Sequence, residues 1–203
     1  MIAIIDYGVG NIFSLYHSFK RIGADVELTG DTDKIKQSEK IILPGVGAFR
    51  DAANILREMG LADLIKDEAS KGKPILGICL GMQLLFDKSF EYGETKGLGL
   101  IEGCVRPISD RIPKGLKIPQ IGWNSLSYPN KNALFEKTPE GSFVYFVHSY
   151  FADTPRENII AETEYGAPLT AAVARGNVYG VQFHPEKSGD VGLGILKAFC
   201  ERT

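Results

Sequence analysis

The sequence predicts one α/β domain over residues 1–203, built on a mixed, mostly parallel central sheet flanked by helices. Two observations favour this fold. The first half alternates short, fully apolar runs with amphipathic segments, as in parallel strands that helices cover on both faces. The second half is rich in strand-like runs and closes with a helix. No internal repeat or long linker divides the chain, and its length suits one domain.

The first half predicts strands and helices in alternation. The strands are expected at residues 2–5, 26–28, 40–43 and 74–78. The helices are expected at residues 11–21, 49–58, 61–70 and 80–86. Asn11 is a residue type that caps a helix, and Gly23 suits the end of the same helix.

The second half predicts strands at residues 142–147, 159–163, 169–174 and 178–183. Gly176 and Asn177 suit a hairpin turn between the last two. A final helix is expected over about residues 189–201, with Leu193, Leu196 and Phe199 or Cys200 toward the core. In such folds the active site lies beyond the carboxyl ends of the parallel strands.

Composition and charge exclude several classes of function. The net charge of −2 gives no reason to expect nucleic acid as a partner. Three cysteines do not suggest a disulfide framework, which favours a reducing cytoplasm. There is no signal-peptide pattern and no apolar stretch of membrane-spanning length, so we expect no membrane association.

Neither a metal nor a dinucleotide cofactor is expected. The histidines and cysteines are scattered without the spacing of metal ligands. Gly8 and Gly10 follow a strand as in a dinucleotide fingerprint, but Phe13 stands where the third glycine would be.

The strongest motif is GICLG at residues 77–81, between an apolar strand and a helix. A sharp strand-to-helix turn with flanking glycines is the arrangement of a nucleophile elbow, here with Cys79 at its centre. The helix N-terminus favours the thiolate, and the Leu80 amide would face a developing oxyanion. A buried structural cysteine is the alternative, and it is our interpretation of Cys104 and Cys200.

A nucleophilic thiolate needs a histidine and a group that orients it. His184 ends an apolar strand, and Pro185 keeps the segment extended. Residues i and i+2 of an extended segment share a side, so Glu186 can meet His184. A strand-end histidine beside an exposed glutamate is the alternative. His148 also ends a strand and is a candidate pocket residue, but it has no nearby carboxylate, and His17 is expected at the surface.

These motifs resemble those of the class I glutamine amidotransferases. The nucleophile motif matches at residues 77–83, the histidine–glutamate motif at 183–186, and the oxyanion loop at 44–47, with Val46 where many members have Gly. Residues 6–11, 119–124 and 147–150 and Lys187 are similar to one branch of the family. Glutaminases of that branch supply ammonia to a synthase that makes imidazole glycerol phosphate and aminoimidazole carboxamide ribotide in histidine biosynthesis.

The resemblance implies roles for individual residues. Cys79 would attack the carboxamide of L-glutamine, His184 would act as acid and base, and Glu186 would orient it. The oxyanion would be held by backbone amides of Leu80, Val46 and Gly47. Gln83, on the helical face of Cys79, is expected to bind the substrate. The family further implies substrate contacts from Glu91, Ser149 and Tyr150.

The resemblance also implies a heterodimer with a separate synthase subunit, a barrel with its own active site. Asn11, Trp123, Tyr145 and Lys187 match family residues at or near that interface, although from sequence alone Trp123 is more typical of a core aromatic. Three other interpretations stay open: a glutaminase for pyridoxal phosphate or GMP synthesis, an intracellular peptidase with a cysteine elbow, and a catalytically silent regulatory subunit. The motif at residues 6–11 and the Trp123 segment argue against the first, turnover of glutamine rather than peptides would exclude the second, and the intact triad candidates count against the third.

Overall fold

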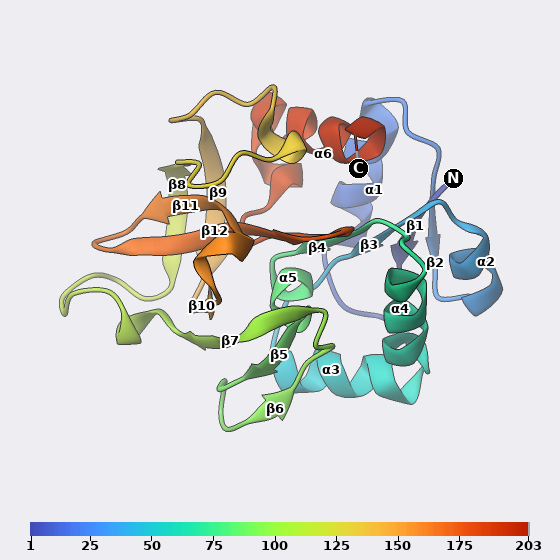
Figure 1. The fold of residues 1–203 in the computed structure, drawn as a ribbon, viewed down its shortest axis with the longest axis horizontal. Helices are drawn as coiled ribbons and strands as arrows, with labels where there is room; N and C mark the ends of the chain where they lie inside the picture. Colours follow the sequence, from blue (N-terminus) through green and yellow to red (C-terminus); the bar gives the residue numbers. More distant parts are fainter. Residues whose placement is uncertain (203) are drawn as a thin grey trace.

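The computed structural model describes residues 1–202, with the backbone alone at Arg202. Its main feature is a seven-stranded sheet (Figure 1). In spatial order the strands are β11 (Ile159–Glu164), β12 (Pro168–Arg175), β13 (Val178–Val181), β4 (Ile75–Ile78), β3 (Lys40–Leu43), β1 (Ile2–Ile5) and β2 (Val26–Thr29). The five strands from β13 to β2 are parallel, whereas β11 and β12 are antiparallel. The predicted mixed, mostly parallel sheet is therefore confirmed.

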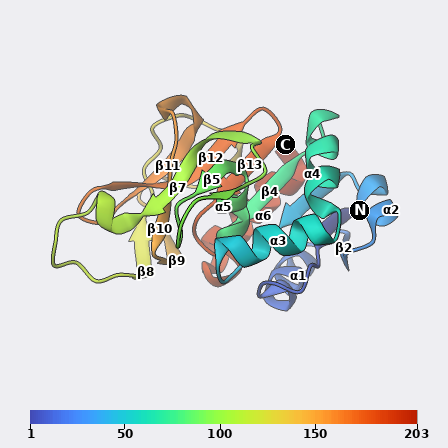
Figure 2. The ribbon, with the colours of Figure 1, turned by 90° about the horizontal axis from the view of Figure 1, so that it is seen from below.

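Helices cover both faces of this sheet. One face carries α1 (Ile12–Arg21) and α6 (Gly189–Arg202), and the other carries α3 (Phe49–Glu58), α4 (Leu61–Ser70) and α5 (Leu80–Leu84) (Figure 1). Figure 2 shows α3 and α4 in front of the sheet, and α2 (Thr32–Gln37) beyond them toward β2. Each face has its own apolar core, with Phe49 and Leu56 fully buried on one and Phe19 and Phe199 on the other. Burial on both faces explains why the inner strands β1 and β4 are apolar throughout.

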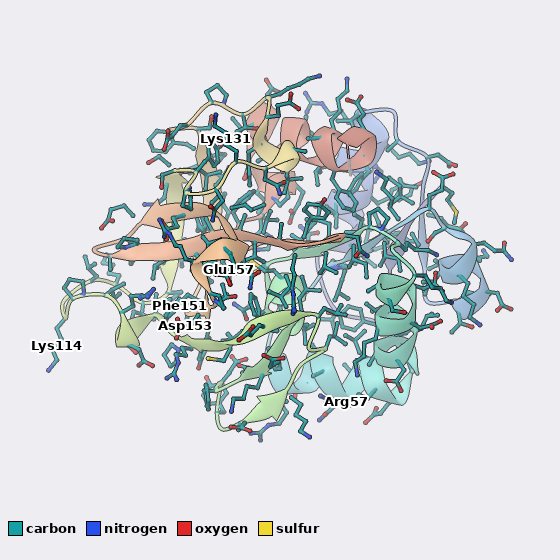
Figure 3. The ribbon with its side chains drawn as sticks, viewed as in Figure 1. Arg57, Lys114, Lys131, Phe151, Asp153 and Glu157 are labelled. Carbon is teal, nitrogen blue, oxygen red and sulfur yellow. The ribbon has the colours of Figure 1, made fainter. Side chains whose placement is uncertain are left out.

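Two smaller sheets complete the described chain. One has the order β10 (Tyr150–Asp153), β7 (Ile101–Pro107), β5 (Phe86–Ser89) and β6 (Thr95–Lys96), and it packs against α5 and α3. The other is the hairpin pair β8 (Gln120–Ser125) and β9 (Phe143–His148). The segment that joins β7 to β8 extends away from the rest, with Lys114 near its tip (Figure 3).

Three local predictions need correction. The helix after Cys79 ends at Leu84, because Phe86 already begins β5. Asn11 precedes α1, but its side chain makes no capping hydrogen bond. On α6, Leu196 and Phe199 are fully buried as predicted, but Leu193 is half-buried and Ile195 is fully buried.

Two further observations concern residues 1–202. No helix there is long and apolar enough to span a bilayer. The same residues contain no group of three or more side chains arranged to hold a metal ion.

Candidate active site

The strand register brings the two strongest sequence motifs to one edge of the sheet. β13 lies parallel to β4, with Val181 opposite Ile78. Both strands therefore end at the same edge of the sheet, where β4 leads into Cys79 and β13 leads toward His184. The Cys79 N–H donates to the Val181 carbonyl at 2.8 Å, which ties the two exits together.

Cys79 adopts the strained backbone that the GICLG motif predicts. Its φ of 55° and ψ of −112° lie in a region that favours glycine. A Cβ at Gly77 would lie 2.6 Å from the Gly81 carbonyl oxygen, and one at Gly81 would lie 1.8 Å from that of Leu43. Both flanking glycines are therefore required by the close backbone approach that holds the turn.

His184 and Glu186 meet as their spacing predicts. Nδ1 of His184 lies 2.8 Å from Oε1 of Glu186, and each side chain is only 4% exposed. Burial favours the neutral ring, but hydrogen bonds to Cys79 and Glu186 outweigh it and raise the pKa of His184 to about 10. The ring is therefore an imidazolium at neutral pH, positioned between the sulfur and the carboxylate.

Tyr7 supports the loop next to Cys79. Its hydroxyl donates to the Pro44 carbonyl at 2.8 Å. Burial, and then the negative charge on Cys79, raise the pKa of Tyr7 well above its usual value, so the phenol stays a donor. In the same loop Gly47 has the positive φ of 95°, and Val46 is not among the positive-φ residues of the described chain. The β-branched side chain of Val46 is thus compatible with the loop.

The expected site residues gather around one cavity of about 450 Å³. Its lining includes every residue expected to act on the substrate except Glu186, which lies behind His184. The lining residues are Val46, Gly47, Cys79, Leu80, Gln83, Glu91, Tyr92, Pro119, Val147, His148, Ser149, Tyr150 and His184. A cavity of this size suits a small metabolite.

Two of these lining residues also have structural contacts. Oε2 of Glu91 accepts a 2.6 Å hydrogen bond from the Phe49 N–H, at the start of α3. Nε2 of Gln83 donates to the Tyr150 carbonyl at 3.3 Å. In each case one side-chain oxygen remains for a ligand.

His148 is the second histidine of the cavity, and it is in the opposite charge state. Burial lowers the pKa of His148 to about 4, and the nearby His184 adds to this effect. Nδ1 of the ring lies 2.7 Å from the Tyr150 carbonyl oxygen, and Nε2 lies 3.0 Å from Oε1 of Gln120. His148 therefore fixes the backbone at Tyr150.

Three of the four expected interface residues form one cluster close to the cavity. The rings of Trp123 and Tyr145 meet edge to face, with centroids 6.0 Å apart, and Lys187 Nζ lies 5.6 Å from the Tyr145 ring centre. Trp123 is 52% exposed, so it is not a core aromatic. The Tyr145 carbonyl accepts the His184 N–H at 2.9 Å, which joins the cluster to the active site. Asn11 is exposed just before α1.

Comparison with known proteins decides the family. The family model for glutamine amidotransferase class-I matches residues 3–202. The chain belongs to the class I glutamine amidotransferase family. It is 49% identical over 199 residues to imidazole glycerol phosphate synthase subunit HisH of Bacillus cereus (strain AH187), covering 98% of this chain and 93% of that protein. It is 50% identical over 202 residues to the same subunit of Caldanaerobacter subterraneus subsp. tengcongensis, covering 99% and 98%.

Solved structures agree on the fold of this amidotransferase. PurLQS from Thermotoga maritima matches with a TM-score of 0.76 at 24% identity, over 98% of this chain and 96% of that one. The α/β arrangement is therefore that of the family, and the chain is a glutamine amidotransferase.

One buried residue beside Cys79 was not predicted from the sequence. Gln182 is fully buried, and its Nε2 lies 3.6 Å from Sγ of Cys79. The available signal was a glutamine between Val181 and Phe183 in an apolar strand, since a buried amide needs partners.

Proposed function

We propose that this chain is the glutaminase subunit of an imidazole glycerol phosphate synthase. It would hydrolyse L-glutamine and pass the ammonia to a synthase subunit that makes imidazole glycerol phosphate and aminoimidazole carboxamide ribotide in histidine biosynthesis. The observation that carries the proposal is the 49–50% identity to HisH subunits over nearly the whole chain. The meeting of Cys79, His184 and Glu186 supports the chemistry.

The first half of the reaction transfers the glutamyl group to sulfur. The Cys79 thiolate attacks the carboxamide carbon, a C–S bond forms, and the carbonyl electrons move to oxygen. Backbone amides of Leu80, Val46 and Gly47 would hold this oxyanion, and each such donor is typically worth about 100- to 1000-fold in rate. The C–N bond then breaks, and the His184 imidazolium gives its proton to the leaving nitrogen, which departs as ammonia.

The second half restores the enzyme. Neutral His184 takes a proton from water, and the resulting hydroxide attacks the thioester carbon. The C–S bond breaks, so glutamate leaves and the thiolate reforms beside the imidazolium. Glu186 holds the ring in one orientation and stabilises its charged form throughout.

The remaining lining groups suit the two ends of glutamine. The free oxygen of Glu91 is a partner for the α-ammonium group, and the backbone at Ser149 and Tyr150 faces the same cavity for the α-carboxylate. Gln83 presents its side-chain amide oxygen, because its nitrogen is already used.

The β8–β9 hairpin offers a surface for the synthase subunit. Trp123 pairs with Tyr145 across the two strands, and side chains alternate between the faces of such a pair. The outer face exposes large apolar groups, with Ile121 61%, Trp123 52% and Phe143 56% exposed. An apolar patch of this kind, joined to the site through Tyr145, suits a partner that receives ammonia.

This assembly would be a heterodimer with a barrel-type synthase subunit. The chain's own step is a hydrolysis, and the complete synthase acts as a lyase. A catalytic thiol needs reducing surroundings, so we place the enzyme in the cytoplasm.

The direct test measures glutamate release from glutamine by the full chain, alone and with a synthase subunit and its ribotide ligand. Strong stimulation by subunit and ligand together is expected. High activity without stimulation would place the protein with another amidotransferase, and turnover of peptides instead of glutamine would make it a peptidase.

A matched pair of variants tests the nucleophile. Cys79→Ala removes the attacking sulfur and should abolish glutamate release, whereas Cys104→Ala should leave it unchanged. Full activity in Cys79→Ala would refute the mechanism.

A further inference from the structure

A chain of buried side-chain amides leads away from the nucleophile. Gln182 and Gln83 are 0% and 6% exposed. Nε2 of Gln182 lies 3.6 Å from Sγ of Cys79, and Oε1 of Gln182 accepts from Nε2 of Gln83 at 2.9 Å. The same Gln83 nitrogen donates to the Tyr150 carbonyl at 3.3 Å. Gln182 has no part in the mechanism described above.

The network fixes which end of each amide faces which neighbour. A backbone carbonyl only accepts hydrogen bonds, so the Gln83 group that faces the Tyr150 oxygen must be its NH₂. That NH₂ also meets Gln182, which must therefore present its oxygen to Gln83. The NH₂ of Gln182 is left on the side of the sulfur. The opposite orientation of Gln182 would bring two NH₂ groups together and leave a buried donor unpaired.

The backbone of Gln182 is fixed as well. Its N–H donates to the Ala171 carbonyl of β12 at 2.8 Å, one residue beyond the end of β13. The amide therefore reaches the sulfur from a paired part of the sheet. A preorganised donor of this kind needs no rearrangement when charge appears.

We propose that Gln182 is a further catalytic residue, whose side-chain amide donates to Sγ of Cys79 and stabilises the thiolate. The proposal rests on the proposed function, because it takes Cys79 as the nucleophile. His184 is the other donor to the same sulfur. His184 gives up its proton during the reaction, whereas the Gln182 amide keeps its own. Gln182 thus holds the sulfur in place for the second half of the cycle, when the thiolate must reform.

Three substitutions test whether Gln182 acts as a hydrogen-bond donor or only fills its place in the core. Gln182→Met keeps the approximate shape and removes the N–H. Gln182→Glu is nearly isosteric but turns a negative oxygen toward the sulfur, which disfavours the thiolate further. Gln83→Met leaves Gln182 in place but removes the contact that orients it.

The experiment follows alkylation of Cys79 by iodoacetamide as a function of pH, in the full chain without glutamine or partner. Peptide mapping by mass spectrometry separates Cys79 from Cys104 and Cys200. With Gln182→Met we expect the midpoint of the profile to move up by about one pH unit, so that the rate falls about tenfold on the acid side of the midpoint. Gln182→Glu should move it further, and Gln83→Met should move it less. Gln37→Glu, at an exposed glutamine of α2, is the matched control and should leave the profile unchanged.

The outcomes are distinguishable. An unchanged midpoint in folded Gln182→Met and Gln182→Glu overturns the proposal and leaves the proposed function intact, since alkylation needs neither glutamine nor the synthase. If Gln182→Met does not fold, Gln182→Glu and Gln83→Met decide between the same two results. Wild-type Cys79 that stays unreactive at every pH would overturn both the nucleophile and the donor.

Discussion

Replacing Glu186 by glutamine tests the orienting carboxylate with little change of shape. The substitution removes the charge 2.8 Å from Nδ1 of His184, where both side chains are 4% exposed. A hydrogen bond to a charged group contributes about 1.5–3 kcal/mol. This corresponds to about 1–2 pH units in the pKa of His184, since one unit is about 1.36 kcal/mol.

The same energy sets the expected loss of rate. If the interaction is fully used in the transition state, kcat for glutamate release falls about 10- to 200-fold. A loss near 10⁴, as for the equivalent change in a serine triad, is not expected, because Cys79 already has the imidazolium as its partner. His184 must be protonated to release ammonia, and its pKa is about 10. The alkaline limb of the rate profile should therefore move down by about 1–2 pH units.

The assay compares kcat against pH for wild type and Glu186→Gln, with the same synthase subunit and ligand present. Glu157→Gln is the control, because Glu157 is exposed on η3 (Arg156–Asn158) and does not line the cavity. Urea unfolding confirms that the variant is folded. A folded Glu186→Gln with wild-type kcat and an unmoved alkaline limb would show that the carboxylate does not act on His184.

Three other substitutions give independent checks. Gly81→Ala places a Cβ 1.8 Å from the Leu43 oxygen, so we expect loss of Cys79 alkylation and a lower melting temperature, whereas Gly194→Ala has open space and should be neutral or slightly stabilising. The pKa of His148 is about 4 in the native state and 6.5 in the unfolded state. As the pH falls from 6.5 to 4, the unfolded state therefore takes up a proton at this residue and the native state does not. The contribution of this pKa difference to the free energy of unfolding, about 3 kcal/mol, is fully present above pH 6.5 and is lost as the pH falls toward 4. Urea unfolding of His148→Gln should therefore lack this loss of stability between pH 6.5 and pH 4. Lys187→Ala should weaken synthase binding about tenfold by calorimetry, and unchanged affinity and ammonia transfer would remove it from the interface.

The central sheet was predictable because each signal was local. Strands at residues 2–5 and 40–43 and helices at 49–58 and 61–70 agree with the structure to the residue. Short runs of three or four apolar residues between glycines, prolines and amphipathic segments leave few alternatives.

The segment between Phe86 and Ser125 was not predicted, and its chemistry explains why. β5 has the sequence FDKS, with Asp87 exposed and Lys88 half-exposed. Its strand geometry comes from pairing with β6 and β7, and the register with β7 shifts in the stretch that contains Gly103, whose φ is 133°. Such strands depend on tertiary pairing, which periodicity does not report.

The catalytic candidates were predictable for a different reason. The Cys79 turn and the His184–Glu186 spacing are each set within five residues, so their geometry follows from backbone rules alone. Gln182 could not be assigned in this way. Its function depends on Gln83 and on the Tyr150 carbonyl, which are brought near only when three separate segments meet.

The two buried histidines differ in charge because only one of them has a carboxylate beside it in the sequence. Burial lowers the pKa of both rings, yet the pKa of His148 is about 4 and that of His184 about 10. His148 faces two uncharged oxygens, those of the Tyr150 carbonyl and the Gln120 side chain, and these do not favour a charged ring enough to offset its burial. His184 faces the sulfur and a carboxylate two residues along the chain, and these stabilise the imidazolium. The presence of Glu186 beside one strand-end histidine, and the lack of a neighbouring carboxylate beside the other, therefore predict from sequence that His184 is the one that moves protons.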